Sequence, residues 1–282
     1  MTSTVWQTSR FTIDLSQPKV MAIVNLTPDS FSDGGRYASL KQSLEHAQKA
    51  LSHGADLLDI GGESSRPGAA AVSVQEELDR ILPFLKEAVR WNVPLSVDTL
   101  KPEVMRAVLD LGVDIINDIW ALRQPGALDA VAQHPSCGVC LMHMHREPLT
   151  MAEQPMEGDA VAQVKEFLSQ RLEACVTAGV HANRIVLDPG IGFGKTIPQN
   201  LSLLKQQSEL LKLGRPLLAG WSRKGSLGKL TAIQGVVPEA SERVGASVGA
   251  ALMSVQNGAS LVRVHDVQET VQAIRFWQAT TI

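Results

Sequence analysis

Three segments of the chain share one pattern, in which a glycine is followed by a short branched apolar run and a polar end. They are residues 54–60, 112–118 and 258–264, and each follows a helical pattern of apolar residues. Glycine ends a helix well because it adopts a positive φ without steric penalty. A short branched apolar run is typical of a buried parallel strand. The pattern therefore predicts repeated helix–strand units.

Five further apolar runs lead to or near a polar residue. They are residues 20–24, 95–97, 139–142, 185–187 and 216–219, which precede Asn25, Asp98, His143, Asp188 and Ser222. Helical faces lie between the runs, such as Leu40, Leu44, Ala47 and Leu51, or Val267, Val271, Ile274 and Trp277. Eight strand–helix alternations with short connections predict a (β/α)8 TIM barrel of the α/β class.

The chain is expected to form one domain over residues 1–282, with residues 5–13 as an N-terminal hairpin at the base of the barrel. Its length suits one barrel, for which roughly 250 residues are typical. The alternative is a doubly wound open sheet, which predicts a G-x-G-x-x-G turn after the first strand. Residues 25–35 read Asn-Leu-Thr-Pro-Asp-Ser-Phe-Ser-Asp-Gly-Gly instead, which favours the barrel.

Charge and cysteine content limit the partners and the compartment. A net charge of −3 gives no reason to expect nucleic acid or an acidic membrane as a partner. No apolar run is long enough to predict a membrane span, and the N-terminus lacks a secretory signal pattern. The low, odd number of cysteines is typical of a reducing compartment, so we expect a cytoplasmic protein. Cys137 and Cys140 form a C-x-x-C pair in an apolar run, which favours core packing over zinc.

Two long loops follow the first two strands, on the face where barrel enzymes carry their chemistry. Residues 25–35 contain Asp33 and end in two glycines, which suits a mobile lid. Residues 61–68 form the second loop and contain Arg66. Three later strands each end in one polar residue: Asp98, Asn117 and Asp188. We expect these residues to surround the barrel mouth and to bind the hydrogen-bond donors of a heterocycle.

Cationic side chains follow the last two strands, where barrel enzymes often bind phosphate. Lys224 lies after the seventh strand, and Arg263 and His265 share one side of the eighth. Residues 190–196 are not a Walker A loop because Pro189 replaces a required glycine, so their glycines are expected to let a flat ligand approach the backbone. His143 and His145 also share a side, which leaves open a transition-metal site.

Together these motifs resemble the dihydropteroate synthase family, from about Val20 to Gln278. The most specific motif is residues 25–35, and the second is Asp-Ile-Gly-Gly-Glu-Ser-Ser-Arg-Pro-Gly at residues 59–68. Residues 188–195, 222–224 and 263–266 complete the series in the expected order. The resemblance implies a transferase that joins 6-hydroxymethyl-7,8-dihydropterin diphosphate to 4-aminobenzoate, with Mg²⁺ as cofactor, in folate biosynthesis.

The same resemblance implies a role for each matching residue. Those expected to hold the pterin are Asp98, Asn117, Asp188 and Lys224, with Met142 and Phe193 flanking its ring or the aminobenzoate. Those expected around the diphosphate are Arg263, His265 and Asn25, the last also as a Mg²⁺ ligand. Ser65 and Arg66 would belong to the second loop and bind substrate, and Asp33 would order the first. Asp33, Asp98 and Lys224 are the expected catalytic residues.

The family's reaction implies loss of diphosphate to leave a pterin methylene cation, which the aminobenzoate amine attacks. This chain departs from the family at Gly225, where serine is common, so the aminobenzoate carboxylate would rely on backbone N–H groups or Ser226. Ser65 replaces the usual threonine, and His145 and Arg146 replace the Gln-Gly pair that is commoner in the family. The family also implies a homodimer through the C-terminal helices, including residues 240–255.

Three alternative functions differ in what they require of these residues. A pterin-binding methyltransferase shares the barrel but needs no diphosphate site. A Schiff-base lyase would use Lys195 or Lys224 as its nucleophile. A catalytically silent partner protein would be expected to lack Asn25, Arg263 or His265, and all three are present.

Overall fold

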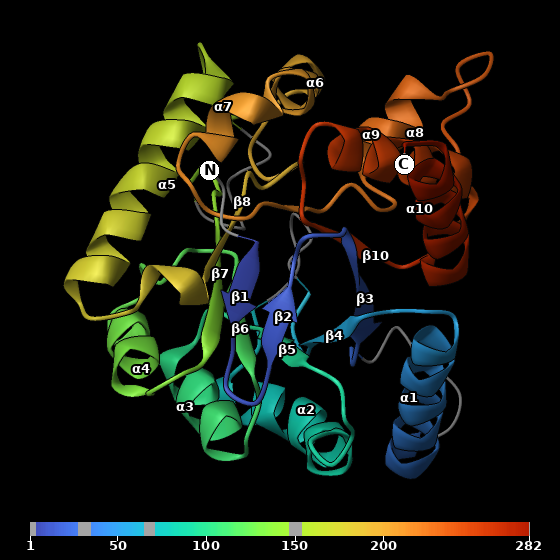
Figure 1. The fold of residues 1–282 in the computed structure, drawn as a ribbon. Coiled ribbons are helices and arrows are strands. Elements are labelled where there is room, and N and C mark those ends of the chain that lie inside the picture. Colours follow the sequence, from blue (N-terminus) through green and yellow to red (C-terminus); the bar gives the residue numbers. More distant parts are fainter. Residues whose placement is uncertain (1–3, 28–34, 65–70, 147–153, 282) are drawn as a thin grey trace.

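A curled parallel sheet forms the centre of the molecule (Figure 1). This computed structural model describes residues 4–27, 35–64, 71–146 and 154–281. The strands pair in the order β8-β7-β6-β5-β4-β3-β10-β9, and a parallel bridge between Leu187 and Leu217 joins the two edges. They are β3 (Lys19–Asn25), β4 (Leu57–Gly61), β5 (Leu95–Asp98), β6 (Ile115–Asp118), β7 (Gly138–Met142), β8 (Ile185–Asp188), β9 (Leu218–Ala219) and β10 (Leu261–Val264). The predicted barrel is therefore confirmed over the open sheet.

Helices surround the barrel on its outer side (Figure 1). They are α1 (Gly35–Ser52), α2 (Val74–Ala88), α3 (Pro102–Asp110), α4 (Ala127–Gln133), α5 (Ala160–Thr177), α6 (Ile197–Lys205), α7 (Gln207–Leu211), α8 (Gly225–Leu230), α9 (Val244–Gln256) and α10 (Val267–Thr281), with 3₁₀ turns at Ala182–Arg184 and Ala240–Glu242. The glycines of the repeated pattern come just after helices, and each has a positive φ: +97° for Gly54, +101° for Gly112 and +93° for Gly258. This left-handed conformation is the one that a glycine after a helix was expected to adopt.

Side-chain alternation along the strands divides the barrel interior into layers. The lower layer is apolar, and its buried members are Met21, Leu57, Ile115, Cys140, Val186, Leu218 and Leu261. The residues two or more positions further along the same strands include Asn25, Asp59, Asn117, Asp188 and Arg263. The interior therefore changes from apolar to polar towards the carboxyl ends of the strands, which concentrates the chemistry at that mouth.

The predicted N-terminal hairpin is present and packs on the apolar layer. Strands β1 (Val5–Gln7) and β2 (Thr12–Asp14) pair antiparallel, with Trp6 opposite Ile13. Trp6 is fully buried, and its indole Nε1 donates a hydrogen bond to the carbonyl oxygen of Arg184 at 2.8 Å. The hairpin therefore covers the base of the barrel, at the opposite end from the polar mouth.

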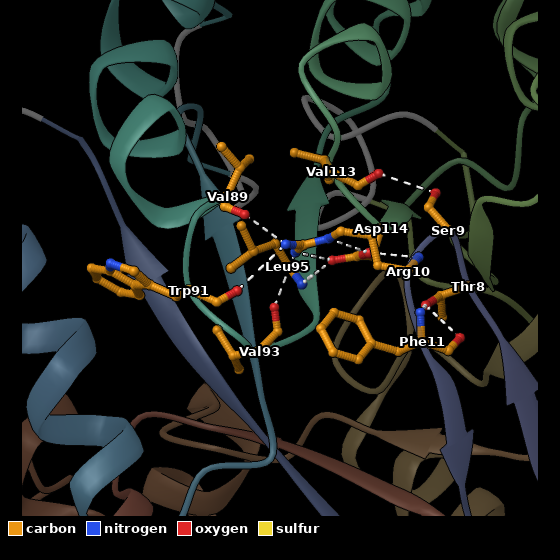
Figure 2. Close-up of polar contacts among 10 residues, drawn as sticks. All are labelled: Thr8, Ser9, Arg10, Phe11, Val89, Trp91, Val93, Leu95, Val113 and Asp114. Carbon is orange, nitrogen blue, oxygen red and sulfur yellow. Dashed lines mark hydrogen bonds and ion pairs between the residues drawn. The ribbon is translucent and has the colours of Figure 1, made fainter.

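Arg10 makes the ion pair that joins the hairpin to the barrel (Figure 2). The Arg10 guanidinium lies 2.6 Å from a carboxylate oxygen of the fully buried Asp114 and also donates to the carbonyls of Val89 and Val93. The same carboxylate accepts the backbone N–H of Leu95 at 2.9 Å. Asp114 thus links the hairpin to the start of β5.

Candidate active site

Asp59 is the centre of the polar network inside the barrel. Its side chain on β4 is fully buried and accepts hydrogen bonds from three other strands. Ser96 Oγ of β5 lies 2.6 Å away, Asn117 Nδ2 of β6 lies 3.1 Å away, and Arg263 Nε of β10 lies 2.6 Å away. A buried carboxylate needs such partners because an unpaired buried charge is costly.

Arg263 joins this centre to the mouth. Its Nη2 donates to Asp98 Oδ2 at 2.8 Å, so one guanidinium binds two carboxylates. Burial raises the pKa of Asp98 to about 7, against the lowering effect of Arg263 and with further raising from Asp59. Asp98 can therefore exchange a proton near neutral pH.

The opposite wall of the mouth is built from the ends of β8 and β9. Asp188 accepts the backbone N–H of Gly190 at 2.7 Å, and burial raises its pKa. The ammonium nitrogen of Lys224 lies 4.1 Å from the centre of the Phe193 ring. Burial and then the charge of Arg263 lower the pKa of Lys224 to about 8, while Asp188 and Asp98 act in the opposite direction.

Phe193 belongs to an apolar wall beside these charges. It forms one buried cluster with Ile119, Met142 and Met144, and Trp120 packs against the cluster. An apolar wall next to carboxylates, an amide and an ammonium group suits a flat heterocycle with several N–H and C=O groups on its edge.

The glycines of residues 190–194 allow close packing of their own loop, and their predicted role in letting a ligand approach the backbone stays a prediction. A Cβ atom on Gly190 would lie 1.8 Å from the carbonyl oxygen of His143, and one on Gly194 would lie 2.7 Å from the Cβ of His145. These glycines are therefore required for the loop to pack against the end of β7. Only Gly192 faces Lys224, with a constructed Cβ 3.3 Å from its Cδ atom.

Lys195 holds this loop from inside. Its buried ammonium group donates to the carbonyl oxygens of Gly190, Phe193 and His143 at 2.8, 3.1 and 3.3 Å. Three acceptors match its three N–H bonds. Lys195 is thus committed to the backbone, which disfavours it as a Schiff-base nucleophile.

The remaining predicted residues lie at the rim or outside the described residues. His265 Nδ1 lies 3.0 Å from the hydroxyl of Ser222, in the loop that follows β9. Asn25 ends β3 and is half-buried beside Gly61, whose constructed Cβ lies 3.8 Å from Asn25 Oδ1. The predictions for Asp33, Ser65 and Arg66 fall outside the described residues.

A triad of Lys101, Glu63 and the buried Glu77 holds the described stems of the second loop. The Lys101 ammonium lies 2.5 Å from a carboxylate oxygen of Glu63 and 2.6 Å from one of Glu77. The other Glu63 oxygen accepts the backbone N–H of Val72 at 3.1 Å. Glu63 therefore ties together the chain on either side of residues 65–70.

The transition-metal site that His143 and His145 left open gains no support from the described residues. His143 is buried edge-on against Phe167, and burial lowers its pKa to about 2. Within the part of the chain that the structure describes, no cluster of three His, Cys, Asp or Glu side chains is arranged for a metal. Cys137 and Cys140 are buried and form no disulfide, in agreement with the prediction of core packing.

The predicted ring of strand-end residues is thus gathered in one mouth, and the structure adds members that sequence reasoning missed. Asp59 and Ser96 were not predicted as site residues, and Lys195 was considered only as the nucleophile of the alternative lyase. Alternation from Leu57 through Asp59 to Gly61 would have placed Asp59 inward, and this signal was available. Arg263 was expected around a diphosphate, but its guanidinium is directed at two carboxylates, so its contact with phosphate stays a prediction.

Known proteins share both the sequence and the fold. A sequence profile described as "Pterin binding enzyme" matches residues 21–265. The dihydropteroate synthase of Neisseria meningitidis serogroup B is 48% identical over 283 residues, spanning 99% of this chain and 98% of that protein. The structure of Xanthomonas albilineans dihydropteroate synthase with 4-aminobenzoic acid is 48% identical with a TM-score of 0.91, covering 99% and 98% of the two chains. That of Burkholderia cenocepacia dihydropteroate synthase complexed with 7,8-dihydropteroate is 44% identical with a TM-score of 0.88, covering 99% and 97%.

Proposed function

The chain belongs to the dihydropteroate synthase family, transferases of folate biosynthesis, and from this premise we propose how its barrel mouth carries out the reaction. The enzyme joins 6-hydroxymethyl-7,8-dihydropterin diphosphate to 4-aminobenzoate and releases 7,8-dihydropteroate and diphosphate. The observation that carries the proposal for the site is the position of Asp98, Asn117, Asp188 and Lys224 around one mouth with Phe193 as its wall.

The pterin ring binds with its edge towards these polar groups. Asp188 and Asp98 accept its ring and amino N–H groups, while Asn117 and Lys224 face its polar edge. The ring lies against Phe193 and Met142, which belong to the same apolar cluster. Asp59 does not touch the ring in this proposal but fixes the side chains of Asn117 and Arg263 that border it.

Bond breaking releases diphosphate and leaves a methylene cation conjugated with the pterin. The buried carboxylates of Asp98 and Asp188 lie close to that positive charge and stabilise it. Arg263 on β10 and His265, which follows that strand, lie towards the leaving group, and Lys224 contributes a further cation at this side. The neutral amine of aminobenzoate then attacks the methylene carbon and loses a proton to water or the released diphosphate, so a strong general base is not required.

Mg²⁺ fits this mouth as a partner of the diphosphate. Asn25 places a hard amide oxygen at the carboxyl end of β3, half-buried and beside Gly61. Mg²⁺ usually takes few protein ligands and completes its shell with phosphate oxygens and water. When bound, the ion supplies charge neutralisation for the leaving diphosphate, and Asn25 would hold it.

The aminobenzoate binds at the outer part of the mouth. Ser65 and Arg66 of the second loop are proposed to contact it, and Asp33 to order the first loop. Ser226, which follows the departure at Gly225, has a buried hydroxyl without a hydrogen-bond partner among the described residues. We assign this hydroxyl to the aminobenzoate carboxylate.

The protein is further proposed to act as a cytoplasmic homodimer. Large apolar side chains are exposed beside and on the predicted contact helix α9, with Ile233 75%, Val236 71% and Met253 49% exposed. Exposed large apolar side chains of this kind suit a protein interface when they lie together. No helix in the described ranges has the length and apolarity needed to cross a bilayer.

A coupled assay for dihydropteroate, with and without Mg²⁺, tests the proposal. Formation of dihydropteroate from the two substrates, and its loss when Mg²⁺ is chelated, is the expected result. Lys224→Ala is expected to abolish turnover and leave the circular dichroism spectrum unchanged. Normal turnover by this variant would contradict the assigned site. A covalent adduct after borohydride treatment with substrate would instead support Schiff-base chemistry.

A further inference from the structure

Arg223, the residue before Lys224, has a backbone conformation that is uncommon for a residue with a side chain. Its φ is +58°, in the left-handed region. Non-glycine residues in this region persist where the surrounding structure determines them, and they concentrate at functional sites. The chain turns here so that Lys224 points into the barrel mouth and becomes the N-cap residue of α8.

Groups from outside the loop hold both the backbone and the side chain of Arg223. Ser247 Oγ, on α9, accepts its backbone N–H at 2.9 Å, and Arg243 Nη1 donates to its carbonyl oxygen at 2.9 Å. Its guanidinium lies 2.5 Å from a carboxylate oxygen of the buried Asp266, which follows β10. Gly228 of α8 leaves space for Arg243, because a Cβ there would lie 2.6 Å from Arg243 Nε.

We propose that Ser247, Arg243 and Asp266 are positioning residues for the transferase reaction, because they hold Arg223 in the left-handed conformation that directs Lys224 into the mouth. None of the three needs to contact substrate. The inference rests on the proposed role of Lys224 in binding the pterin diphosphate. It makes the start of α9 a functional element of the site.

The surroundings of Lys224 give this inference a readout that a purely structural role would not change. Asp98 of β5, Asp188 of β8, Arg263 of β10 and the Phe193 ring face its ammonium group. Burial lowers the pKa of Lys224 to about 8. If Lys224 is freed to reach solvent, its pKa rises towards its ordinary value. Its ammonium group then stays protonated to higher pH, and activity persists to higher pH with it.

Ser247→Ala tests the inference directly, and α9 offers a matched control. Ser247 donates from its hydroxyl to the carbonyl oxygen of Arg243, four residues earlier, and Ser254 donates in the same way to Ala250. Both serines are buried. Ser254→Ala therefore removes the same kind of helix hydrogen bond without affecting Arg223.

We expect Ser247→Ala to lower kcat/KM for the pterin diphosphate about tenfold, the factor expected for one lost hydrogen bond of about 1.4 kcal/mol. Its alkaline activity limb should move to higher pH. Ser254→Ala should keep the kcat/KM and pH profile of the unmodified enzyme. Arg243→Met provides a second variant with the same expected loss, should Ser247→Ala not fold.

An unchanged kcat/KM and pH profile in folded Ser247→Ala and Arg243→Met would overturn the inference. An equal loss in Ser254→Ala would also overturn it, since the effect would then reflect stability of α9 alone. Turnover by the unmodified enzyme is measured in the same series. Its absence would contradict the proposed function rather than the positioning role.

Discussion

Replacing Asp59 with asparagine removes the charge that the centre of the barrel is built around. The fully buried carboxylate accepts three hydrogen bonds, from Ser96, Asn117 and Arg263, the last as an ion pair at 2.6 Å. An asparagine keeps the shape of the side chain, but its NH2 group would face hydrogen-bond donors where Asp59 has an acceptor. The Arg263 guanidinium would then have Asp98 as its remaining carboxylate partner. Breaking a buried ion pair by removing one partner costs about 3–5 kcal/mol.

We therefore expect Asp59→Asn to lower the free energy of unfolding by about 3–5 kcal/mol. For a domain of this size, at about 2 °C per kcal/mol, this loss lowers Tm by about 6–10 °C. Differential scanning calorimetry and urea denaturation measure both quantities. Asp98→Asn is the comparison, because Asp98 pairs with Arg263 alone among the described residues and its side chain is 11% exposed, so its loss of stability should be smaller.

A double variant identifies the cause. If the loss comes from an undercompensated guanidinium, Asp59→Asn with Arg263→Met should lose less stability than the sum of the two single variants. A loss of 1 kcal/mol or less corresponds to a Tm shift of about 2 °C. A Tm for Asp59→Asn within about 2 °C of the unmodified protein would therefore refute the reasoning. Strict additivity in the double variant would refute the assigned coupling.

Three other changes test the barrel frame. Burial raises the pKa of Asp98 to about 7. Its contribution to stability should therefore be complete below the pKa of the unfolded chain and decline as the pH rises towards 7. In urea denaturation at a series of pH values, Asp98→Asn should flatten this decline. Arg10→Met should lower the unfolding free energy by about 2 kcal/mol in calorimetry, because Asp114 stays buried without its cation. Lys195→Met should raise KM for the pterin diphosphate, whereas unchanged kinetics would contradict its role in holding Phe193.

Local pattern was enough to predict the elements of the barrel. Glycines 54, 112 and 258 marked the ends of helices because a positive φ is readily available to glycine, and the structure has them at +97°, +101° and +93°. The apolar runs marked buried strands, and their polar ends pointed to the mouth. A closed barrel then brings the carboxyl ends of all its strands together, so Asp98, Asn117 and Asp188 could be predicted as neighbours from position alone.

Which polar side chains bind one another inside the mouth could be known only from the closed barrel. Arg263 and Asp59 are 204 positions apart, and no local signal says that the guanidinium will bind this carboxylate rather than a phosphate. The glycines at 190 and 194 were assigned to ligand approach because their packing against the end of β7 exists only after both loops are folded.

The sequence by itself determined the order of strands and helices, the family and the set of polar residues at the strand ends. The tertiary structure decided which of those residues bind one another, and it revealed the supports of Arg223 on α9. The physical reason is that backbone preference and hydrophobic period act over a few residues. Ion pairs and left-handed conformations depend instead on partners that the chain supplies from distant strands.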